Sequence, residues 1–252
     1  MCIRDRGIIV GDNSVMVIDA QATPTLARQV IQKVRSVTDK PISHLVLSHY
    51  HAVRVLGAAE YKASNIIMSS KARSMVVERG QEDWDSEFDR FPRLFKGHEE
   101  IPGLTWPTTT FDKKMSLFLG KRRVDLYFLG RAHTAGDIVI HVPDSNVLFT
   151  GDIVEYKSAC YCGDAHLQEW PKTLGKIAKF QAVSLVPGRG DALTDPRQIN
   201  DAIELTEDFV TSTFKSVSKI ANAGGDLKEA MSSCRDECDE KFSGYAIYEH
   251  CL

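Results

Sequence analysis

The stretch that decides the fold is residues 45–57, L-V-L-S-H-Y-H-A-V-R-V-L-G. Its first four residues are apolar or small, which predicts a short buried strand. His49 and His51 follow two residues apart, and an apolar run then opens at Val53. Imidazoles between the end of a strand and the start of a helix are fixed by the strand yet reachable on the loop. The pair is therefore a candidate half of a metal site, although two histidines alone are weak evidence for one.

Three later segments share the pattern of a short strand running into a glycine-containing turn with a polar tip. They are G-R-A-H-T-A-G-D at 130–137, F-T-G-D at 149–152 and V-P-G-R-G-D at 186–191. With the first stretch, they resemble the metallo-β-lactamase-fold superfamily, whose ordered motifs are H-x-H-x-D-H, G-H-T, G-D and G-H. The resemblance covers roughly residues 7–205. It implies an α/β fold, the four-layer αββα sandwich, with the motif loops along one edge, and it is far less specific for a substrate.

The same resemblance implies a set of metal ligands. His49 and His51 match the first two histidines of the family and His133 matches the third, while Asp152 matches the bridging carboxylate. Three neutral imidazoles suit Zn²⁺ and leave a position for water, whose pKa on zinc is about 7. We therefore expect one Zn²⁺ per chain, with Fe²⁺ as the alternative. The expected ligands are His49, His51, His133 and Asp152.

The sequence departs from the family at three positions. Val53 stands where the family has its aspartate, Arg54 where it has the adjacent histidine, and Arg189 where it has the last histidine. Valine cannot ligate, and a guanidinium stays protonated with no lone pair to give. A second dication about 5 Å from one guanidinium would be repelled by roughly 6–7 kcal/mol at an effective dielectric constant of about 20. We therefore predict a mononuclear site in which the arginines replace the second ion.

Two interpretations of these arginines stay open. In the first, Arg54 and Arg189 form a clamp for an anionic substrate group or a developing oxyanion. In the second, they pair internally with Asp152, Asp191 or Asp137 and hold loops in place. If both hold Asp152, that carboxylate does not reach the metal. The predicted catalytic residues are Asp152, Arg54 and Arg189.

Three further polar residues have smaller expected roles. Asp137 is expected to orient a metal-bound imidazole, because carboxylates commonly do so. His166 is a candidate proton shuttle, since it follows the F-T-G-D strand closely. His44 is expected to be structural.

Three functions remain open. The preferred one is a mononuclear zinc-dependent hydrolase that uses metal-bound hydroxide on a small, anionic ester, thioester, lactone or amide. The second is a mononuclear Fe(II) oxygenase similar to persulfide dioxygenases, with His49, His133 and Asp152 as the facial triad. The third is a metal-poor relative that binds a ligand without catalysis.

Composition limits the class of protein. The chain has 252 residues, 43% hydrophobic and 26% charged, with a net charge of −3, as in ordinary globular domains. There is no basic face for nucleic acid and no apolar run of about 18 residues for a membrane. We expect a small-molecule substrate, no nucleic-acid or membrane partner, and an undetermined oligomeric state. The compartment is also undetermined: the cytoplasm is favoured, and the periplasm stays open.

One domain is expected over residues 7–225. Residues 1–6 are interpreted as a non-native or disordered start, and residues 226–252 as an incomplete C-terminal tail. The six cysteines include no C-x-x-C pair, so free thiols in a reducing compartment are expected. The roles of Cys160, Cys162, Cys234 and Cys238 are undetermined.

Hydrophobic periodicity predicts two successive strand and helix units, and the second, strand-rich unit begins at Pro107. Residues 80–107 are acidic and aromatic, and form either a helix that packs its aromatic stripe on the core or a lid insertion over the metal. The predicted strands are 7–10, 14–19, 45–48, 65–68, 108–111, 115–118, 124–129, 138–142, 147–150 and 183–186. The predicted helices are 25–37, 53–62, 70–79, 170–180 and 199–223.

Overall fold

The computed structural model describes residues 7–251, and its internal contacts divide them into two compact units. The N-terminal unit comprises residues 7–128 and 138–145, and the C-terminal unit comprises residues 129–137 and 146–251. The start at residues 1–6 lies outside the described part, and the expected single domain over 7–225 stays a prediction. Within residues 7–251, no helix has both the length and the apolar character that a membrane crossing requires.

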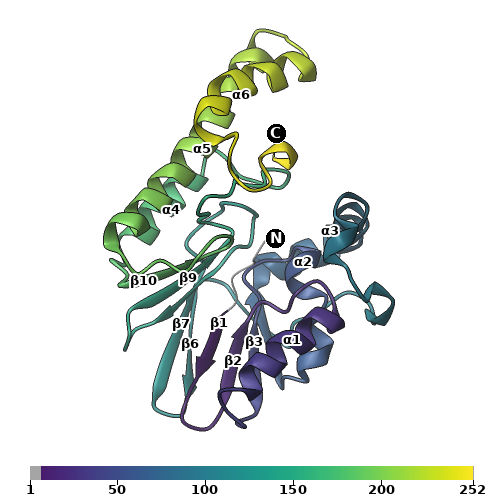
Figure 1. Cartoon of the computed structure of the whole chain (residues 1–252), viewed down its shortest axis with the longest axis vertical. Coiled ribbons are helices and arrows are strands. Elements are labelled where there is room, and N and C mark those ends of the chain that lie inside the picture. The colour runs from purple at the N-terminus through teal and green to yellow at the C-terminus, as the bar shows by residue number, and fades with distance from the viewer. Residues whose placement is uncertain (1–6, 252) are drawn as a thin grey trace. The chain divides into compact units, whose positions relative to one another are not determined.

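The strands belong to two sheets of five, and the first lies entirely in the N-terminal unit. Its order is β1-β2-β3-β4-β5, with β1 antiparallel to β2 and the other neighbours parallel. Parallel neighbours need crossover connections, which are almost always right-handed. Because the strand order never reverses, α1, α2 and α3 all fall on the same side of this sheet (Figure 1). The bounds are β1 Gly7–Val10, β2 Val15–Ile18, α1 Pro24–Arg35, β3 Ile42–Val46, α2 Ala52–Val55, β4 Asn65–Ser69, α3 Ser70–Arg90 and β5 Thr109–Phe111.

The same unit holds an antiparallel meander from the second sheet. It consists of β6 (Lys114–Leu119), β7 (Arg122–Tyr127) and β8 (Val139–Val142). Along β6 the burial alternates, as expected for a strand with one face toward solvent. By contrast, all four residues of β2 are buried, as in a strand covered on both faces.

Four of the sequence predictions need correction in the N-terminal unit. The strand that precedes the histidines spans Ile42–Val46 and so ends before Ser48. β5 pairs with β4 and therefore belongs to the first sheet, whereas the sequence placed it in the second strand-rich unit. The helix expected over 53–62 is two short helices, α2 and the 3₁₀ helix η1 (Ala58–Tyr61). The helix expected over 70–79 runs on to Arg90.

Gly57 explains the break between α2 and η1. A Cβ atom at this position would lie 2.4 Å from the carbonyl oxygen of Ala20 and 2.8 Å from that of Thr23. The Gly57 amide also donates to the carbonyl of Gln21 at 2.8 Å. This close approach to a neighbouring loop fixes the backbone here and ends α2 after one turn.

The segment 80–107 is partly helical. α3 covers its first half, and the 3₁₀ helices η2 (Pro92–Leu94) and η3 (His98–Glu100) follow. Phe95 is buried and its ring lies 5.6 Å from that of Phe88, which favours a segment packed on the core. The role as a lid stays a prediction.

The C-terminal unit carries the parallel pair β9 (Val147–Gly151) and β10 (Ser184–Pro187). Its helices are α4 (Trp170–Ala178), α5 (Pro196–Asn222) and α6 (Leu227–Phe242), followed by the 3₁₀ helix η4 (Tyr248–His250). α6 turns back beside α5 (Figure 1), where the rings of Phe209 and Phe242 lie 5.2 Å apart. The five cysteines among residues 7–251 are all free thiols. Cys234 and Cys238 share the buried face of α6.

Candidate metal centre

The buried imidazole of His49 is held from one side by a short polar chain in the N-terminal unit. Ser48 donates its backbone N–H to Asp19 Oδ1 at 2.8 Å and its hydroxyl to Asp19 Oδ2 at 3.0 Å. The Ser48 oxygen therefore accepts from His49, whose Nδ1 lies 2.9 Å away. With the proton on Nδ1, the Nε2 atom of His49 keeps its lone pair, as a metal ligand requires.

His51 lies beside His49 at the entrance to α2. The two ring centroids are 4.9 Å apart and the ring planes are nearly perpendicular, at 88°. Both side chains are buried. His51 Nε2 lies 3.8 Å from Asp83 Oδ1, a carboxylate oxygen carried by α3.

α3 supplies two buried carboxylates to the first turn of α2. Asp83 Oδ2 accepts the backbone N–H of Ala52 at 2.7 Å, and Glu87 Oε2 accepts that of Val53 at 2.9 Å. Because residues four apart share a helix face, both acids reach the same turn. The sequence analysis missed both, since an acidic stretch ordinarily marks a solvated helix face. Here Asp83 and Glu87 lie on the buried face of α3, whereas Trp84 is partly exposed.

Arg54 is fully buried in the N-terminal unit, and its Nη1 lies 3.6 Å from Asp19 Oδ2. This carboxylate is the same one that holds Ser48. The sequence analysis did not consider Asp19 as a partner of Arg54, and the role of Arg54 toward a substrate stays a prediction. Asp19 directly follows β2 and has a positive φ of 62°. The local sequence does not predict this conformation.

His133, in the C-terminal unit, is buried and held through Nδ1 in the same way as His49. Its Nδ1 lies 3.0 Å from the backbone carbonyl oxygen of Tyr161. A carbonyl can only accept, so the imidazole donates through Nδ1 and keeps its lone pair on Nε2. That nitrogen lies 3.7 Å from Asp152 Oδ2. The ring centroids of His133 and the buried Trp170 lie 5.8 Å apart, and the ring planes are inclined at 63°.

A buried ion-pair cluster surrounds Asp152. Arg189 Nη1 lies 2.9 Å from Asp152 Oδ2 and also contacts Glu155 Oε1 at very short range. All three side chains are buried. One guanidinium thus meets two carboxylates, and Glu155 is a partner that the sequence analysis missed. Asp191, which it did consider, is exposed.

Asp137 and His166 also lie in the C-terminal unit. Asp137 accepts the backbone N–H of Thr134 at 2.6 Å and the Thr134 hydroxyl at 2.8 Å, so it fixes the turn that carries His133. His166 donates its backbone N–H to Ala132 at 2.8 Å. Burial, with a smaller effect of Arg131, lowers the pKa of the His166 imidazole. Its role as a proton shuttle stays a prediction.

Gly188 makes room for Asp152. A Cβ atom at Gly188 would lie 2.4 Å from Asp152 Oδ1 and 2.6 Å from its Cα. Gly188→Ala should therefore displace Asp152 and lower the free energy of unfolding by about 1–3 kcal/mol. Gly175→Ala is the matched control, because a Cβ atom there meets nothing within 4 Å and a helical alanine should add about 0.5–1 kcal/mol. Urea unfolding measures both, and equal stability of the two variants would contradict the steric argument.

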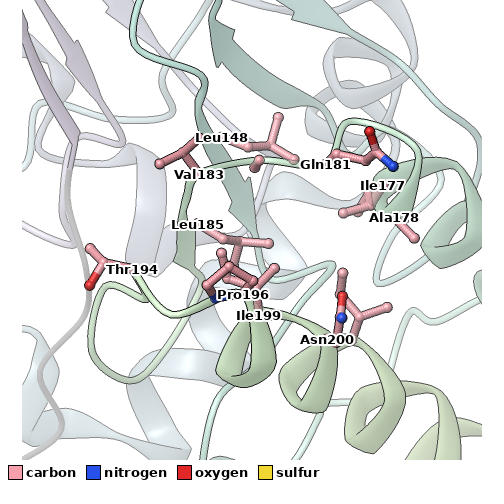
Figure 2. A pocket seen from close by; sticks show the side chains of 12 residues that line it. Leu148, Ile177, Ala178, Gln181, Val183, Leu185, Thr194, Pro196, Ile199 and Asn200 are labelled. Atoms are coloured by element: carbon pink, nitrogen blue, oxygen red, sulfur yellow. The ribbon is translucent and has the colours of Figure 1, made fainter.

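A pocket of about 450 Å³ lies elsewhere in the C-terminal unit (Figure 2). Leu148, Val183 and Leu185 approach it from the strand side, and Ile177 and Ile199 from α4 and α5. None of the predicted site residues lines it, so this pocket is not the candidate metal centre.

His49, His51 and His133 are thus buried candidate metal ligands. In both His49 and His133, the contact at Nδ1 leaves the lone pair on Nε2. The positions that depart from the family motif provide no ligand: Val53 packs in the core, and Arg54 and Arg189 contact carboxylates.

Comparison with known proteins gives one consistent result. A family model described as the metallo-beta-lactamase superfamily matches residues 7–174. The metallo-beta-lactamase type 2 of Bacteroides fragilis is 24% identical over 217 residues, which are 84% of this chain and 77% of that protein. The enzyme of the same name from Bacillus cereus is 23% identical, over 75% of this chain and 68% of its own length.

Solved structures agree. The metallo-beta-lactamase from Pontibacter korlensis has a TM-score of 0.62 at 20% identity, covering 80% of this chain and 86% of that one. The metallo-beta-lactamase IND-7 has a TM-score of 0.62 at 19% identity, with coverage of 81% and 87%. Likeness at this level of identity identifies the fold and leaves the substrate open.

Proposed function

Because the chain belongs to the metallo-beta-lactamase superfamily, we propose that it is a mononuclear zinc-dependent hydrolase of a small, anionic ester, thioester, lactone or amide. The mixed α/β fold of that superfamily, the expected αββα class, is confirmed by the two sheets, the helices and the structural neighbours. The activity is the proposal, and the proposed ligands are His49, His51 and His133.

One observation supports the proposal most directly: the imidazoles of His49 and His133 are both held through Nδ1. Each is buried, and its Nδ1 donates a hydrogen bond, to the Ser48 hydroxyl oxygen for His49 and to the Tyr161 carbonyl oxygen for His133. Such partners fix the tautomer and the ring orientation of metal-binding histidines. A zinc ion held by His49, His51 and His133 would polarise a substrate carbonyl and lower the pKa of a bound water to about 7.

The proposal of a single ion rests on the residues at the family's other ligand positions. Arg54 and Arg189 have no lone pair, and each is buried against a carboxylate that keeps it in place. We propose that these fixed cations orient the anionic group of the substrate. Asp152, whose position Arg189 fixes, would act as the base or as a fourth ligand.

Metal analysis of protein purified without added metal tests the function. About one zinc per chain is expected, and a chelator should remove both the metal and the activity toward ester, thioester, lactone or β-lactam chromogens until zinc is restored. Iron accompanied by O₂ uptake would instead support an oxygenase of the persulfide dioxygenase type. Absence of any tightly bound metal would support a ligand-binding relative and contradict the proposal.

A further inference from the structure

We propose that Thr173 and Lys176 are positioning residues of the metal centre, which hold from α4 the main chain that leads to His133. The inference rests on the proposed function, since it concerns the support of one proposed ligand. Both residues lie outside the four sequence motifs, and they belong with residues 129–137 to the C-terminal unit. Neither is proposed as a ligand, because each acts through the loop that carries the imidazole.

Two side chains of α4 reach the loop before His133. Thr173 donates its hydroxyl to the carbonyl oxygen of Arg131 at 2.9 Å, and Lys176 donates through Nζ to the carbonyl oxygen of Leu129. The two donors are three positions apart, so they share one face of the helix. Thr173 is only 2% exposed, which protects its bond from water. One face of α4 is therefore bonded to the loop at two points.

The turn that precedes α4 adds a third bond. The backbone N–H of His166 donates to the carbonyl oxygen of Ala132 at 2.8 Å. Together with the two side-chain bonds, this means that three of the four carbonyls directly before His133 accept from the segment 166–176. The direction in which the loop presents its imidazole is thus set by this segment.

Gly130 shows how closely α4 approaches the loop. A Cβ atom at position 130 would lie 2.7 Å from Thr173 Oγ1 and 3.6 Å from Lys176 Nζ. A side chain there would push the hydroxyl away from the main chain. The glycine of the motif G-R-A-H-T at 130–134 therefore makes room for the side chains of α4, a connection that the sequence around Thr173 does not reveal.

The His133 ring also packs against α4. Its centroid lies 5.8 Å from that of Trp170, the first residue of the helix. Trp170 is itself fixed, because it is buried and donates its Nε1–H to the carbonyl oxygen of Ile153 at 2.9 Å. Trp170 precedes Thr173 by three residues, so the same side of α4 contacts the His133 ring and the backbone before it. A tilt of the loop relative to α4 would move Nε2, and metal affinity depends on how such supports orient the ligand.

The experiment compares Thr173→Val, which keeps the size of the side chain but removes the hydroxyl, with Thr173→Ser, which keeps the hydroxyl. Zinc affinity is measured by competition with a chromophoric chelator, and the Co²⁺-substituted proteins are compared by their visible spectra. Thr173→Val should weaken zinc binding by about 10-fold and alter the Co²⁺ spectrum, because the loop is released from α4. Thr173→Ser should remain close to wild type in both measurements.

Lys176→Met tests the second bond, since it removes the donor to Leu129 and keeps the length of the side chain. It should weaken zinc binding in the same direction. Lys176 is partly exposed, so this variant decides the matter if Thr173→Val does not fold. Lys172→Met is the matched control: Lys172 is exposed on the same helix, and its loss should leave zinc affinity and the Co²⁺ spectrum unchanged.

A buried threonine on another helix separates positioning from stability. Thr23 donates to the carbonyl oxygen of Lys96 at 2.8 Å and also caps α1 at Leu26 N. Thr23→Val should therefore lower the urea midpoint of the metal-free protein at least as much as Thr173→Val does, yet leave zinc affinity unchanged.

Three results would overturn the inference and leave the proposed function standing. The first is wild-type zinc affinity in both Thr173→Val and Lys176→Met. The second is equal weakening of zinc binding in Thr23→Val, and the third is equal weakening in Thr173→Ser and Thr173→Val. A wild-type protein that binds no divalent ion would end both proposals.

Discussion

His133→Ala is expected to lose zinc and hydrolytic activity together. The substitution removes one of the three proposed imidazole ligands, and alanine has no group that could replace it. We expect kcat/KM to fall by at least about 1,000-fold, which corresponds to about 4 kcal/mol. Metal analysis and kinetics on the same preparation measure the two losses side by side.

His98→Ala is the control for this experiment. His98 is exposed and lies 3.5 Å from its neighbour Glu99, so its removal should leave zinc content and activity unchanged. If His133→Ala kept its zinc but lost activity, His133 would act on the substrate and the proposed ligand set would be wrong. Full activity in His133→Ala would remove the metal-centre proposal altogether.

Arg189→Met should be the most destabilising substitution in the C-terminal unit. It leaves the buried carboxylates of Asp152 and Glu155 without their shared guanidinium. Removing one partner of a buried ion pair typically costs about 3–5 kcal/mol, because the remaining charge stays in a poorly solvated place. Urea unfolding of the metal-free protein measures the loss without a contribution from metal binding.

An exposed pair on the same unit provides the comparison. Arg235 Nη2 lies 2.8 Å from Glu249 Oε2, where the Arg235 side chain is 36% exposed and that of Glu249 is 69% exposed. Surface pairs of this kind contribute about 0–1 kcal/mol, so Arg235→Met should hardly change the unfolding midpoint. If Arg189→Met were equally mild, the buried cluster would not stabilise the fold, and a role of Arg189 in holding Asp152 would have to be abandoned.

The sequence predicted most strands and helices because their burial follows short-range periodicity. β2 is apolar throughout, and α1 begins where Thr23 caps its first turn through a hydrogen bond to Leu26 N. Predictions failed where contacts distant in sequence decide the structure. β5 joins β4 across the whole of α3, and Gly57 breaks a helix because of a loop near Ala20.

The candidate site likewise contains residues that a motif identifies and residues that only the folded structure reveals. The histidines were found because an ordered motif names them, whereas their partners come from ordinary acidic positions. Asp83 stands in an acidic stretch that is typical of a solvated helix surface, and Asp19 and Glu155 follow apolar residues without belonging to a ligand motif. Each of the three is buried beside a histidine or an arginine. A carboxylate's burial depends on the packing of its whole element, which no local pattern records.

The two supported imidazoles differ in how they can change over evolutionary time. The group that holds His133 is a main-chain oxygen at Tyr161, so no codon change at that position deletes it. The group that holds His49 is the hydroxyl of Ser48, which a single substitution removes. One substitution at Ser48 would therefore remove the support of His49, whereas the support of His133 does not depend on which side chain stands at position 161.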